Sequence, residues 1–583
     1  MSEHLQAGPP APIWKIPEPA SELAARAVAR AHGLGHPLVA QILMRRGLID
    51  DALTHYLTPD LSRLFDPREL RHLPQALAVI DEAVRSGRRI VVYGDYDVDG
   101  TTGASLLESY LRHRGADVSS FIPMRHEGYG LSKSSIERIA RETKPELLLT
   151  VDCGTSSRAE ADLARSLGME VVVTDHHRPT PGKETSGIVV NPHIAGDGYP
   201  NKELAGVAVG YKLIAALHGS HPTANLDLVA LGTIADVMRL DGENRALVRA
   251  GLFRLGHTHR PGLRALLGTA LKEAPCTHGG KSANCYPVTA EQVAFQIGPR
   301  INAIGRMGLD PMLVVELFTT ENETRGAEIA QRLDEANKER RETTNRLVDE
   351  AIAAVDPSAP VLVYQADLFK GVAGLVAGRL AAEFGKPAIV VDLEGSGSAR
   401  SVDGIDLLSV LQGGFGKLVG AAGHSMAMGI HGVADPAALR TALEGYDWPS
   451  ALGRELEIDA VCQIDDLGWP LIESLERLEP TGSGNPAPLF ALGGVTLDGV
   501  KILGAEGRHA KLRLRDDAGS ICSAIWFNCA GKVPEVGARI DVAGRPTVSS
   551  FRGTSSIELQ VAAVRTNSGD LLPTLGAARE SVA

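Results

Sequence analysis

An apolar strand that ends in three closely spaced acidic residues constrains this chain more than any other feature. Residues 90–94 read Ile-Val-Val-Tyr-Gly, and Asp95, Asp97 and Asp99 follow before Gly100. Carboxylates this close repel one another at neutral pH, and each unit of pKa shift that relieves the repulsion costs about 1.4 kcal/mol. A solvated acidic turn and a divalent cation site are two alternative interpretations of such a cluster.

Two further apolar runs end in the same way. A run of leucines leads into Asp152, and a run of valines leads into Asp175, His176 and His177. Adjacent histidines after a strand are also compatible with one imidazole bonded to the backbone and one exposed to solvent. Because three strand ends carry Asp or His, the sequence favours a metal site over that alternative.

Segments with helical periodicity, residues 102–114 and 157–167, separate these strands, so the region is predicted to fold as β-α-β-α-β with a parallel sheet. Ligands of an open parallel sheet bind outside the carboxyl ends of its strands, where these side chains would meet. Asp236, in an otherwise apolar run, is a fourth candidate because burying an unpaired carboxylate is costly. Its alternative role is an internal helix cap.

Six motifs together resemble the DHH phosphoesterase superfamily and, within it, the RecJ family of single-strand-specific exonucleases. They are Gly94-Asp-Tyr-Asp-Val-Asp-Gly-Thr-Thr102, Val151-Asp-Cys-Gly154, Thr174-Asp-His-His177, Ala230-Leu-Gly-Thr-Ile-Ala-Asp236, Gly298-Pro-Arg-Ile-Asn-Ala-Ile-Gly-Arg306 and Gly482-Ser-Gly-Asn-Pro486. The motifs run from near the N-terminus to the last domain, so the resemblance covers almost the whole chain.

The resemblance implies two divalent ions, Mn²⁺ or Mg²⁺. Asp97 and Asp152 would hold one ion. The other would be held by Asp99, Asp152, His176 and Asp236, with Asp152 as the bridging ligand. Carboxylate-rich sites with imidazoles suit these ions better than the thiolate cages that select zinc. Two ions about 3.5–4 Å apart can activate a water and neutralise charge on a leaving oxygen.

Residues beside the ions receive roles from the same resemblance. His177 would contact the scissile phosphate, and Asp95 would take part in ligation. Tyr93 stands where many superfamily members have a ligand histidine, so the first ion would lack one imidazole. Asp175 is expected to orient a histidine from outside the ligand set.

Two basic segments are candidates for nucleic-acid contact within this domain. Arg125 and Tyr129 lie in the segment that begins at Ile122, after a strand that precedes the run leading into Asp152. Arg can bind phosphate there and Tyr can stack on a base, although a solvated loop is the alternative. Arg300, Asn302 and Arg306 lie on a segment with two glycines and a proline, which lets the backbone approach a ligand. We expect backbone contacts with DNA there.

Residues 327–355 contain no proline or glycine and predict a long connecting helix. The α/β region that follows resembles the DHH-associated domain, and the resemblance implies that Ser398 and Arg400 anchor the 5′ phosphate. His424 belongs to a motif that usually reads Gly-Gly-His and has Ala422 in place of the first glycine.

The last region predicts about five short strands with glycine-rich turns, which fits a β-barrel of the OB type. Alternation along one strand places Lys511, Arg513 and Arg515 on a single face. This basic stripe, with the aromatic pair Trp526 and Phe527 on the next strand and Phe551-Arg552 in a turn, suits single-stranded DNA held by charge and stacking. Ordinary polar-out alternation with the aromatics in the core is the alternative.

Composition fits a large enzyme that works inside the cell. The 583 residues, 44% of them hydrophobic, predict three to four domains. No apolar run of about 18 residues and no secretory pattern are found, so we expect a cytoplasmic protein. Six cysteines are too few for a disulfide scaffold, and the spacing from Cys276 to Cys285 fits no zinc pattern and predicts a flexible loop.

The predicted fold class is α/β: a parallel-sheet DHH catalytic domain, a long connecting helix, a second α/β DHH-associated domain and a C-terminal OB-type β-barrel. The expected domains are an N-terminal helical extension (1–80), the catalytic domain (81–325), the connecting helix (326–356), the DHH-associated domain (357–450), the barrel (451–567) and a tail (568–583).

The resemblance implies a metal-dependent 5′-to-3′ exonuclease that releases 5′-mononucleotides from single-stranded DNA in repair and recombination. A helicase and a single-strand-binding protein are implied partners, and a clamp formed by one chain suggests a monomer. The net charge of −12 argues against a basic coat but leaves room for a local basic groove. The alternatives are a phosphodiesterase acting on short RNA or cyclic dinucleotides and a catalytically silent replication factor.

Overall fold

The computed structural model describes residues 12–18, 21–278, 281–448, 455–504, 507–529, 531–551, 554–566 and 572. The chain forms two compact units. One consists mainly of Asp60–Leu452 with Gly482–Asn485, and the other of Ala11–Pro59, Gly453–Thr481 and Pro486–Ala583. The domain boundaries given above remain predictions. No helix in the described ranges has the length and apolarity needed to cross a membrane.

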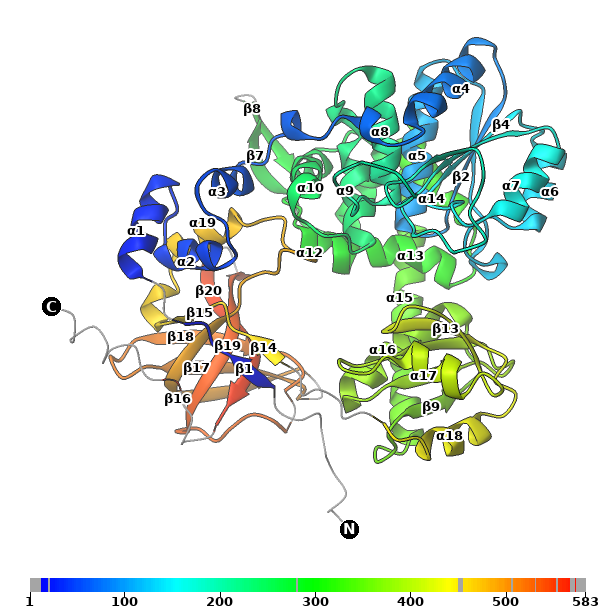
Figure 1. The fold of residues 1–583 in the computed structure, drawn as a ribbon. Helices are drawn as coiled ribbons and strands as arrows, with labels where there is room; N and C mark the ends of the chain where they lie inside the picture. The colour runs from blue at the N-terminus through cyan, green and yellow to red at the C-terminus, as the bar shows by residue number, and fades with distance from the viewer. Residues whose placement is uncertain are drawn as a thin grey trace. The chain divides into compact units, whose positions relative to one another are not determined.

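A five-stranded sheet of the first unit is parallel at every pairing and confirms the predicted topology (Figure 1). In spatial order its strands are β3 (Val118–Phe121), β2 (Ile90–Gly94), β4 (Leu147–Val151), β5 (Glu170–Thr174) and β6 (Ile188–Val190). The connecting helices are α5 (Val98–His113), α6 (Lys133–Glu142) and α7 (Arg158–Ser166).

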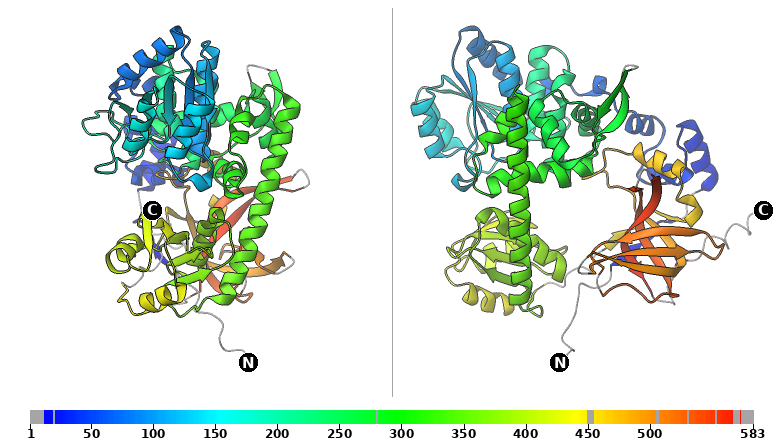
Figure 2. Two further views of the ribbon diagram at one scale, coloured as in Figure 1. Left: turned by 90° about the vertical axis from the view of Figure 1, so that its right-hand side faces the viewer. Right: turned by 180° about the vertical axis from the view of Figure 1, so that it is seen from behind.

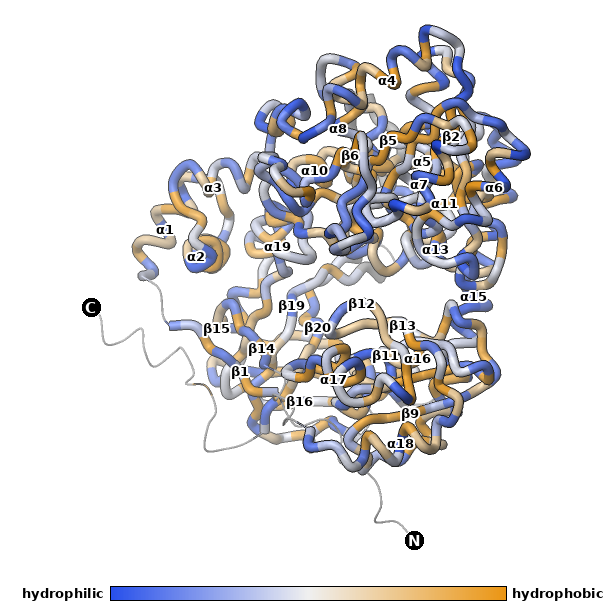
Figure 3. The backbone as a smooth tube through the Cα atoms, turned by 45° about the vertical axis from the view of Figure 1, so that its right-hand side comes forward, coloured by the Kyte–Doolittle hydropathy of each residue, from blue (hydrophilic) through white to orange (hydrophobic). Residues whose placement is uncertain are grey.

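Both faces of this sheet are buried, which explains why its strands are continuous apolar runs. Every residue of β2 and β4 is buried, and alternate side chains enter two different cores. Val92 and Leu149 belong to the core with α5, whereas Val91 and Leu148 belong to the core with α6 and α7. Figure 3 shows the hydrophobic stretches of β2 and β5 among hydrophilic connections.

Helices complete this part of the first unit. They are α4 (Leu73–Arg85), α8 (Gly206–His218), α9 (Leu226–Ala235), α10 (Gly242–Gly256), α11 (Pro261–Ala270), α12 (Ala290–Gln292), α13 (Gly298–Arg306) and α14 (Met312–Thr319), with a π-helical turn at Val293–Ile297. The predicted loop between Cys276 and Cys285 is wrong, because β7 (Ala274–His278) and β8 (Lys281–Cys285) pair as an antiparallel hairpin.

The predicted connecting helix is α15 (Glu323–Ala354), the long green helix of Figure 2. Ile329 and Leu333 in its first half pack into the core of the parallel-sheet region, whereas Leu347 and Val348 in its second half pack against the next α/β region. One helix therefore contributes to two hydrophobic cores of the first unit.

The second α/β region has a mixed sheet of order β12-β13-β11-β10-β9, in which β9 and β10 are parallel and the other pairs are antiparallel. Its elements are β9 (Leu362–Gln365), α16 (Lys370–Phe384), β10 (Ala388–Val391), β11 (Gly397–Arg400), α17 (Leu407–Gly414), β12 (Gly420–Gly423), β13 (Ala427–His431) and α18 (Pro436–Glu444).

The second unit contains the predicted five-stranded barrel. Its strands are β16 (Phe490–Leu503), β17 (His509–Arg515), β18 (Ile521–Trp526), β20 (Thr554–Arg565) and β19 (Arg539–Phe551), and pairing of β16 with β19 closes the barrel. The remaining elements are β1 (Ile13–Lys15), α1 (Glu22–Ala31), α2 (Pro37–Arg45), α3 (Asp50–Leu57), β14 (Glu455–Glu457), β15 (Ala460–Cys462) and α19 (Trp469–Glu476). The predicted tail, apart from Leu572, and Arg552 lie outside the described residues.

Candidate metal centre and nucleic-acid contacts

The carboxyl ends of three neighbouring strands bring the predicted acidic and histidine side chains together. Asp95 follows β2, Asp152 follows β4, and His176 and His177 follow β5, while Asp236 arrives on the C-terminal end of α9. Three groups have ligand atoms within 4.8 Å of one another: Asp95, Asp97 and Asp152; Asp99, His176 and Asp236; and Asp152, His176 and His177.

His176 lies at the centre of the cluster. Its Nε2 atom is 3.2 Å from a carboxylate oxygen of Asp152, 3.4 Å from one of Asp236 and 3.8 Å from one of Asp99. A hydrogen bond to the backbone of Leu204 orients the ring. Burial, together with the neighbouring His177, lowers the pKa of His176 to about 4. The imidazole is therefore neutral at pH 7, which is the form that binds metal.

Several polar atoms in the cluster are buried without a hydrogen-bond partner. They are Asp95 Oδ1, Asp152 Oδ1, His176 Nε2 and Asp236 Oδ2. Burial and neighbouring carboxylates raise the pKa of Asp99 to about 7 and that of Asp236 to about 9, and raise that of Asp152 as well. Unpaired buried oxygens that face one another are strongly unfavourable unless a cation lies between them. The donor set fits divalent ions that prefer oxygen and imidazole ligands.

The N-terminus of α8 holds Asp99 in place, an interaction that the sequence analysis missed. The backbone N–H groups of Gly206 and Val207 donate to the two oxygens of Asp99 at 2.6 and 2.9 Å. A side chain at Gly206 would bring its Cβ within 2.5 Å of Asp152 Cβ. The sequence offers only a glycine before the apolar residues Val207-Ala-Val209 as a signal, and the partners of Gly206 lie 107 and 54 residues earlier in the chain.

Asp97 opens α5 as its cap. One of its carboxylate oxygens accepts from the N–H groups of Asp99 and Gly100 at 2.9 and 3.1 Å. This explains why the helix begins at Val98, four residues before the predicted start. The other oxygen of Asp97 remains available to a ligand.

Asp175 fixes the Asp-His-His segment through hydrogen bonds to its neighbours. It accepts from the N–H groups of Thr155 and His176 at 2.9 and 2.7 Å, and its Oδ1 lies 2.9 Å from His177 Nδ1. Despite burial, bonding to His177 lowers the pKa of Asp175 to about 2, and the same pair raises that of His177 to about 9. The hydroxyl of Tyr129 lies 2.7 Å from His177 Nδ1, so Tyr129 belongs to this site.

Tyr93 is a core residue. Its ring is fully buried and stacks on Phe121 with centroids 5.4 Å apart, and its hydroxyl donates to the carbonyl of Gly130 at 2.9 Å. The hydroxyl is therefore used within the fold, and Tyr93 belongs to none of the three groups of candidate ligands. Asp95 forms a group of candidate ligands with Asp97 and Asp152.

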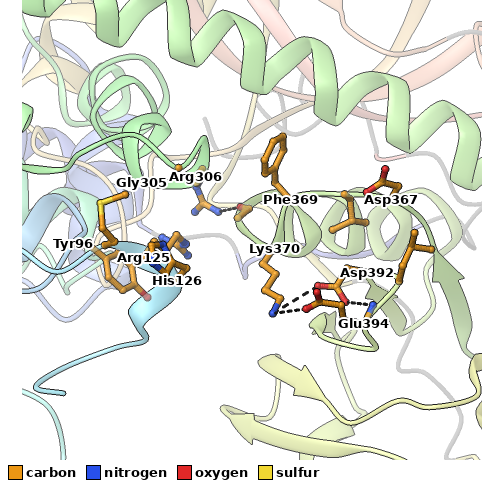
Figure 4. Close-up of a pocket in the computed structure, with 15 residues that line it drawn as sticks. Tyr96, Arg125, His126, Gly305, Arg306, Asp367, Phe369, Lys370, Asp392 and Glu394 are labelled. Atoms are coloured by element: carbon orange, nitrogen blue, oxygen red, sulfur yellow. Dashed lines mark hydrogen bonds and ion pairs between the residues drawn. The ribbon is translucent and has the colours of Figure 1, made fainter. Parts of the chain in front are cut away.

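A cavity of about 620 Å³ lies in the first unit beside the acidic segment (Figure 4). Arg125 lines it with its guanidinium 4.7 Å above the Tyr96 ring, and Arg306 reaches the carbonyl of Gly371 at 2.7 Å. Phe369, 58% exposed, also lines the cavity. Arg125 and Arg306 thus line one cavity, together with the acidic residues Asp367, Asp392 and Glu394, and their contacts with nucleic acid stay predictions.

The other predicted contacts of the first unit occupy different environments. Arg300 is engaged within the fold, because it pairs with Asp334 of α15 at 2.8 Å and donates to the carbonyl of Gln296. Asn302 is half-buried on α13. Ser398 and Arg400 are half-buried on β11, and His424 is exposed between β12 and β13. These roles stay predictions.

The basic strand of the barrel is exposed as predicted, but each cation has a carboxylate partner. Lys511 pairs with Glu558 at 2.5 Å, and Arg513 and Arg515 share Asp498 at 3.0 and 3.1 Å. The two aromatic residues Trp526 and Phe527 lie in different environments. Trp526 packs partly against the barrel core, whereas Phe527 is 49% exposed and contacts His509 edge to face.

Comparison with known proteins places these features in a family. The DHH family N-terminal domain matches residues 89–233, and the RecJ OB domain matches residues 458–563. The chain is 33% identical over 570 residues to the single-stranded-DNA-specific exonuclease RecJ of Bacillus subtilis, covering 94% of this chain and 70% of that protein. It is 31% identical to the protein of the same name from Escherichia coli, covering 89% of this chain and 98% of the other.

Solved structures agree with the sequence comparison. The crystal structure of RecJ in complex with Mn²⁺ from Thermus thermophilus is similar with a TM-score of 0.80 at 31% identity, covering 95% of this chain and 80% of that one. The Mg²⁺ complex from the same organism gives a TM-score of 0.75 at 29% identity and covers 95% and 78% of the two chains. The two structures of this relative contain ions of the class that the donor set fits.

Proposed function

The chain belongs to the RecJ family of single-stranded-DNA-specific exonucleases, and we propose that it degrades single-stranded DNA from the 5′ end. It is a metal-dependent hydrolase that releases 5′-mononucleotides in DNA repair and recombination. The observation that carries this function is the cluster of buried, unpartnered carboxylate and imidazole atoms at the strand ends. The OB-type barrel on the same chain supports a polymeric single-stranded substrate.

Two divalent ions, Mn²⁺ or Mg²⁺, fit the cluster. Asp97 and Asp152 are the proposed ligands of one, with Asp95 beside them. The proposed ligands of the other are Asp99, Asp152, His176 and Asp236. When bound, such ions supply an acidified water and screen the charge of the phosphate. Asp99 is preorganised for ligation because the α8 N-terminus fixes both of its oxygens.

His177 is the proposed contact to the scissile phosphate. Its Nδ1 faces Asp175, so the free ring nitrogen is Nε2, and 42% of its side chain is exposed. With its pKa raised to about 9 by that carboxylate, the ring is cationic at neutral pH. A cationic imidazole held in one orientation can donate to a phosphate oxygen whose negative charge grows during hydrolysis.

Separate basic groups are proposed to hold the strand. Arg125 and Arg306 line the cavity beside Tyr96, and guanidinium groups there would suit phosphates. Tyr129, near His177, is the proposed base-stacking residue. The remaining proposed contacts are Arg300, Asn302, Ser398, Arg400, His424, Lys511, Arg513 and Arg515.

The cellular setting is proposed on the same family grounds. We expect a cytoplasmic enzyme that works beside a helicase and a single-strand-binding protein, and that acts as a monomer. Size-exclusion chromatography with light scattering tests the last point, because a stable dimer would double the mass of the 61.6 kDa chain.

The test of function compares one sequence in four forms: a 5′-labelled single strand, a 3′-labelled single strand, its duplex and a short RNA. Each is incubated with Mn²⁺ and with a chelator. The proposal expects immediate release of labelled mononucleotide from the 5′-labelled single strand only with metal, and late release from the 3′-labelled strand. Faster cleavage of short RNA than of long single-stranded DNA would establish the alternative phosphodiesterase function.

A further inference from the structure

A second cavity of the first unit is surrounded by arginines. It has a volume of about 480 Å³ and lies between α15, α16 and the end of β11. Its charged lining residues are Arg340 and Arg341 of α15, Arg379 of α16 and Arg400 of β11. Among the described residues, no aspartate or glutamate lines it.

These arginines lack the acidic partners that neighbouring arginines have. In the described ranges no carboxylate forms an ion pair with any of the four, whereas Arg325 and Arg346 on the same helix pair with Glu316 and Glu350 at 2.7 and 2.8 Å. The Nε atom of Arg340 is buried without a hydrogen-bond partner. Four guanidinium groups around a cavity without counter-charge repel one another unless an anion enters.

Two arginines of this cavity, Arg340 and Arg400, also repel Arg306, which lines the cavity beside the acidic segment. Burial, followed by the charges of Arg125, Arg340 and Arg400, lowers the pKa of Arg306 to about 10. Burial also lowers the pKa values of Arg340 and Arg400. Arg306 lines the cavity beside the acidic segment, so the two cavities are connected electrostatically through one group of arginines.

Two glycines of α16 leave space for the side chain of Arg400. Gly374 and Gly378 are one helical turn apart and both line the cavity. A side chain at Gly374 would bring its Cβ within 2.7 Å of Arg400 Nη2 and 3.3 Å of Ser398 Oγ. The proposed anchor of the 5′ phosphate, Ser398 with Arg400, therefore adjoins the cavity that Arg340, Arg341 and Arg379 also line.

We propose that this cavity binds the additional phosphates of a strand whose 5′ end carries a triphosphate. The inference rests on the proposed function, because it places the terminal nucleotide at Ser398 and Arg400 and the extra phosphates on Arg340, Arg341 and Arg379. Planar guanidinium groups match the oxygens of a polyphosphate and keep their charge when partly buried. A strand end with one phosphate would leave these three arginines unused.

The chemistry of the first step is then defined. The oxygen of a water joins the phosphorus of the second nucleotide, and the bond from that phosphorus to the 3′ oxygen of the first nucleotide breaks. The 3′ oxygen takes up a proton. The first product is a nucleoside 5′-triphosphate, and the shortened strand carries an ordinary 5′-monophosphate.

The test uses one DNA sequence with a 5′-hydroxyl, a 5′-monophosphate or a 5′-triphosphate end. Arg341→Gln/Arg379→Gln removes two exposed arginines of the cavity, and Arg332→Gln/Arg346→Gln removes the same charge from other exposed positions of α15. We expect the first variant to lose about tenfold or more in kcat/KM on the triphosphate strand, and the control to lose little. Release of nucleoside triphosphate is measured by chromatography. Equal losses on monophosphate and triphosphate strands, or no loss on either, would overturn the proposal.

A binding measurement separates this site from the proposed activity. Inorganic tripolyphosphate is titrated calorimetrically into the full chain with chelator and without DNA. We expect the wild type and the α15 control to bind it, and the cavity variant to bind about tenfold or more weakly. If the wild type binds tripolyphosphate through these arginines but degrades no DNA, only the proposed function fails. If it degrades DNA but equal tripolyphosphate binding persists in the cavity variant, only the cavity proposal fails.

Discussion

The acidic edge of the parallel sheet and the basic strand of the barrel differ in whether their charged side chains are buried and whether they are paired. At the sheet edge, carboxylates are buried, close together and without cationic side chains to neutralise them all. On β17 the cations are exposed, and Lys511, Arg513 and Arg515 each have a carboxylate neighbour. Buried, unpaired charge identifies a place that requires a ligand, whereas exposed, paired charge is compatible with an ordinary protein surface.

The largest effect is expected at Asp152, the proposed bridging ligand. Asp152→Asn keeps a residue type that tolerates the positive φ of 63° at this position, but removes the bridging carboxylate. Exonuclease activity with Mn²⁺ should fall by about 10³-fold or more. The unfolding temperature of the metal-free protein should rise in this variant. Burial and the carboxylates of Asp99 and Asp97 raise the pKa of Asp152, which means that its charged form is unfavourable in the folded protein, and the amide removes that charge. Asp162→Asn, at an exposed position of α7, is the control for loss of one carboxylate. Unchanged activity in Asp152→Asn would refute the two-ion assignment.

A smaller loss is expected from Asp175→Asn, because Asp175 orients His177 without lying in a proposed ligand group. The activity should fall about 10–100-fold. Without the carboxylate the pKa of His177, now raised to about 9, should fall. The cationic imidazole would then be lost at lower pH, so the alkaline limit of the pH–rate profile should move down. A variant that loses activity equally at every pH would show that Asp175 is only structural.

The sequence predicted most of the acidic site because three of its strand ends follow recognisable apolar runs. Asp95, Asp152 and His176 are read from such runs, and parallel pairing then brings them together. Gly206 and the partner of Arg300 were not predictable, because both depend on how separate helices dock. The carboxylates opposite β17 come from other barrel strands, so alternation predicted the exposed face of that strand but not its neutralisation.

A moderate effect is expected on stability as pH changes. The pKa values of Asp99 and Asp236 are raised from 3.8 to about 7 and about 9, and that of His177 from 6.5 to about 9. Between about pH 6.5 and about pH 9 the folded metal-free protein therefore binds more protons than the unfolded chain, and its stability should fall as pH rises. The pKa of His176 is lowered from 6.5 to about 4, so between these values the folded protein binds fewer protons at this group than the unfolded chain. His176 therefore makes stability rise with pH, but only below pH 6.5.

Added metal should remove most of this pH dependence. Mg²⁺ at about 100 times its dissociation constant would stabilise the fold by about 2.7 kcal/mol. The measurement is thermal unfolding at about pH 6.5 and about pH 8.5 with chelator or Mg²⁺. The stabilisation by metal should be larger at the higher pH and absent in Asp152→Asn. A metal-free protein that becomes more stable toward pH 8.5 would contradict the proton linkage.

The smallest effect is expected on the barrel, where Asp498 neutralises two arginines of the basic strand. Asp498→Asn should change stability by less than about 1 kcal/mol, because exposed ion pairs contribute little. If β17 binds DNA, freeing Arg513 and Arg515 should tighten binding of single-stranded DNA severalfold. The slope of log affinity against log salt should also steepen by about 0.7 for each additional phosphate that the strand neutralises. Asp517→Asn, which frees Arg539 on the same barrel, is the matched control. Equal binding by the two variants would mean that the alternation on β17 is ordinary polar-out patterning, and that the DNA-binding face of the barrel lies on other strands.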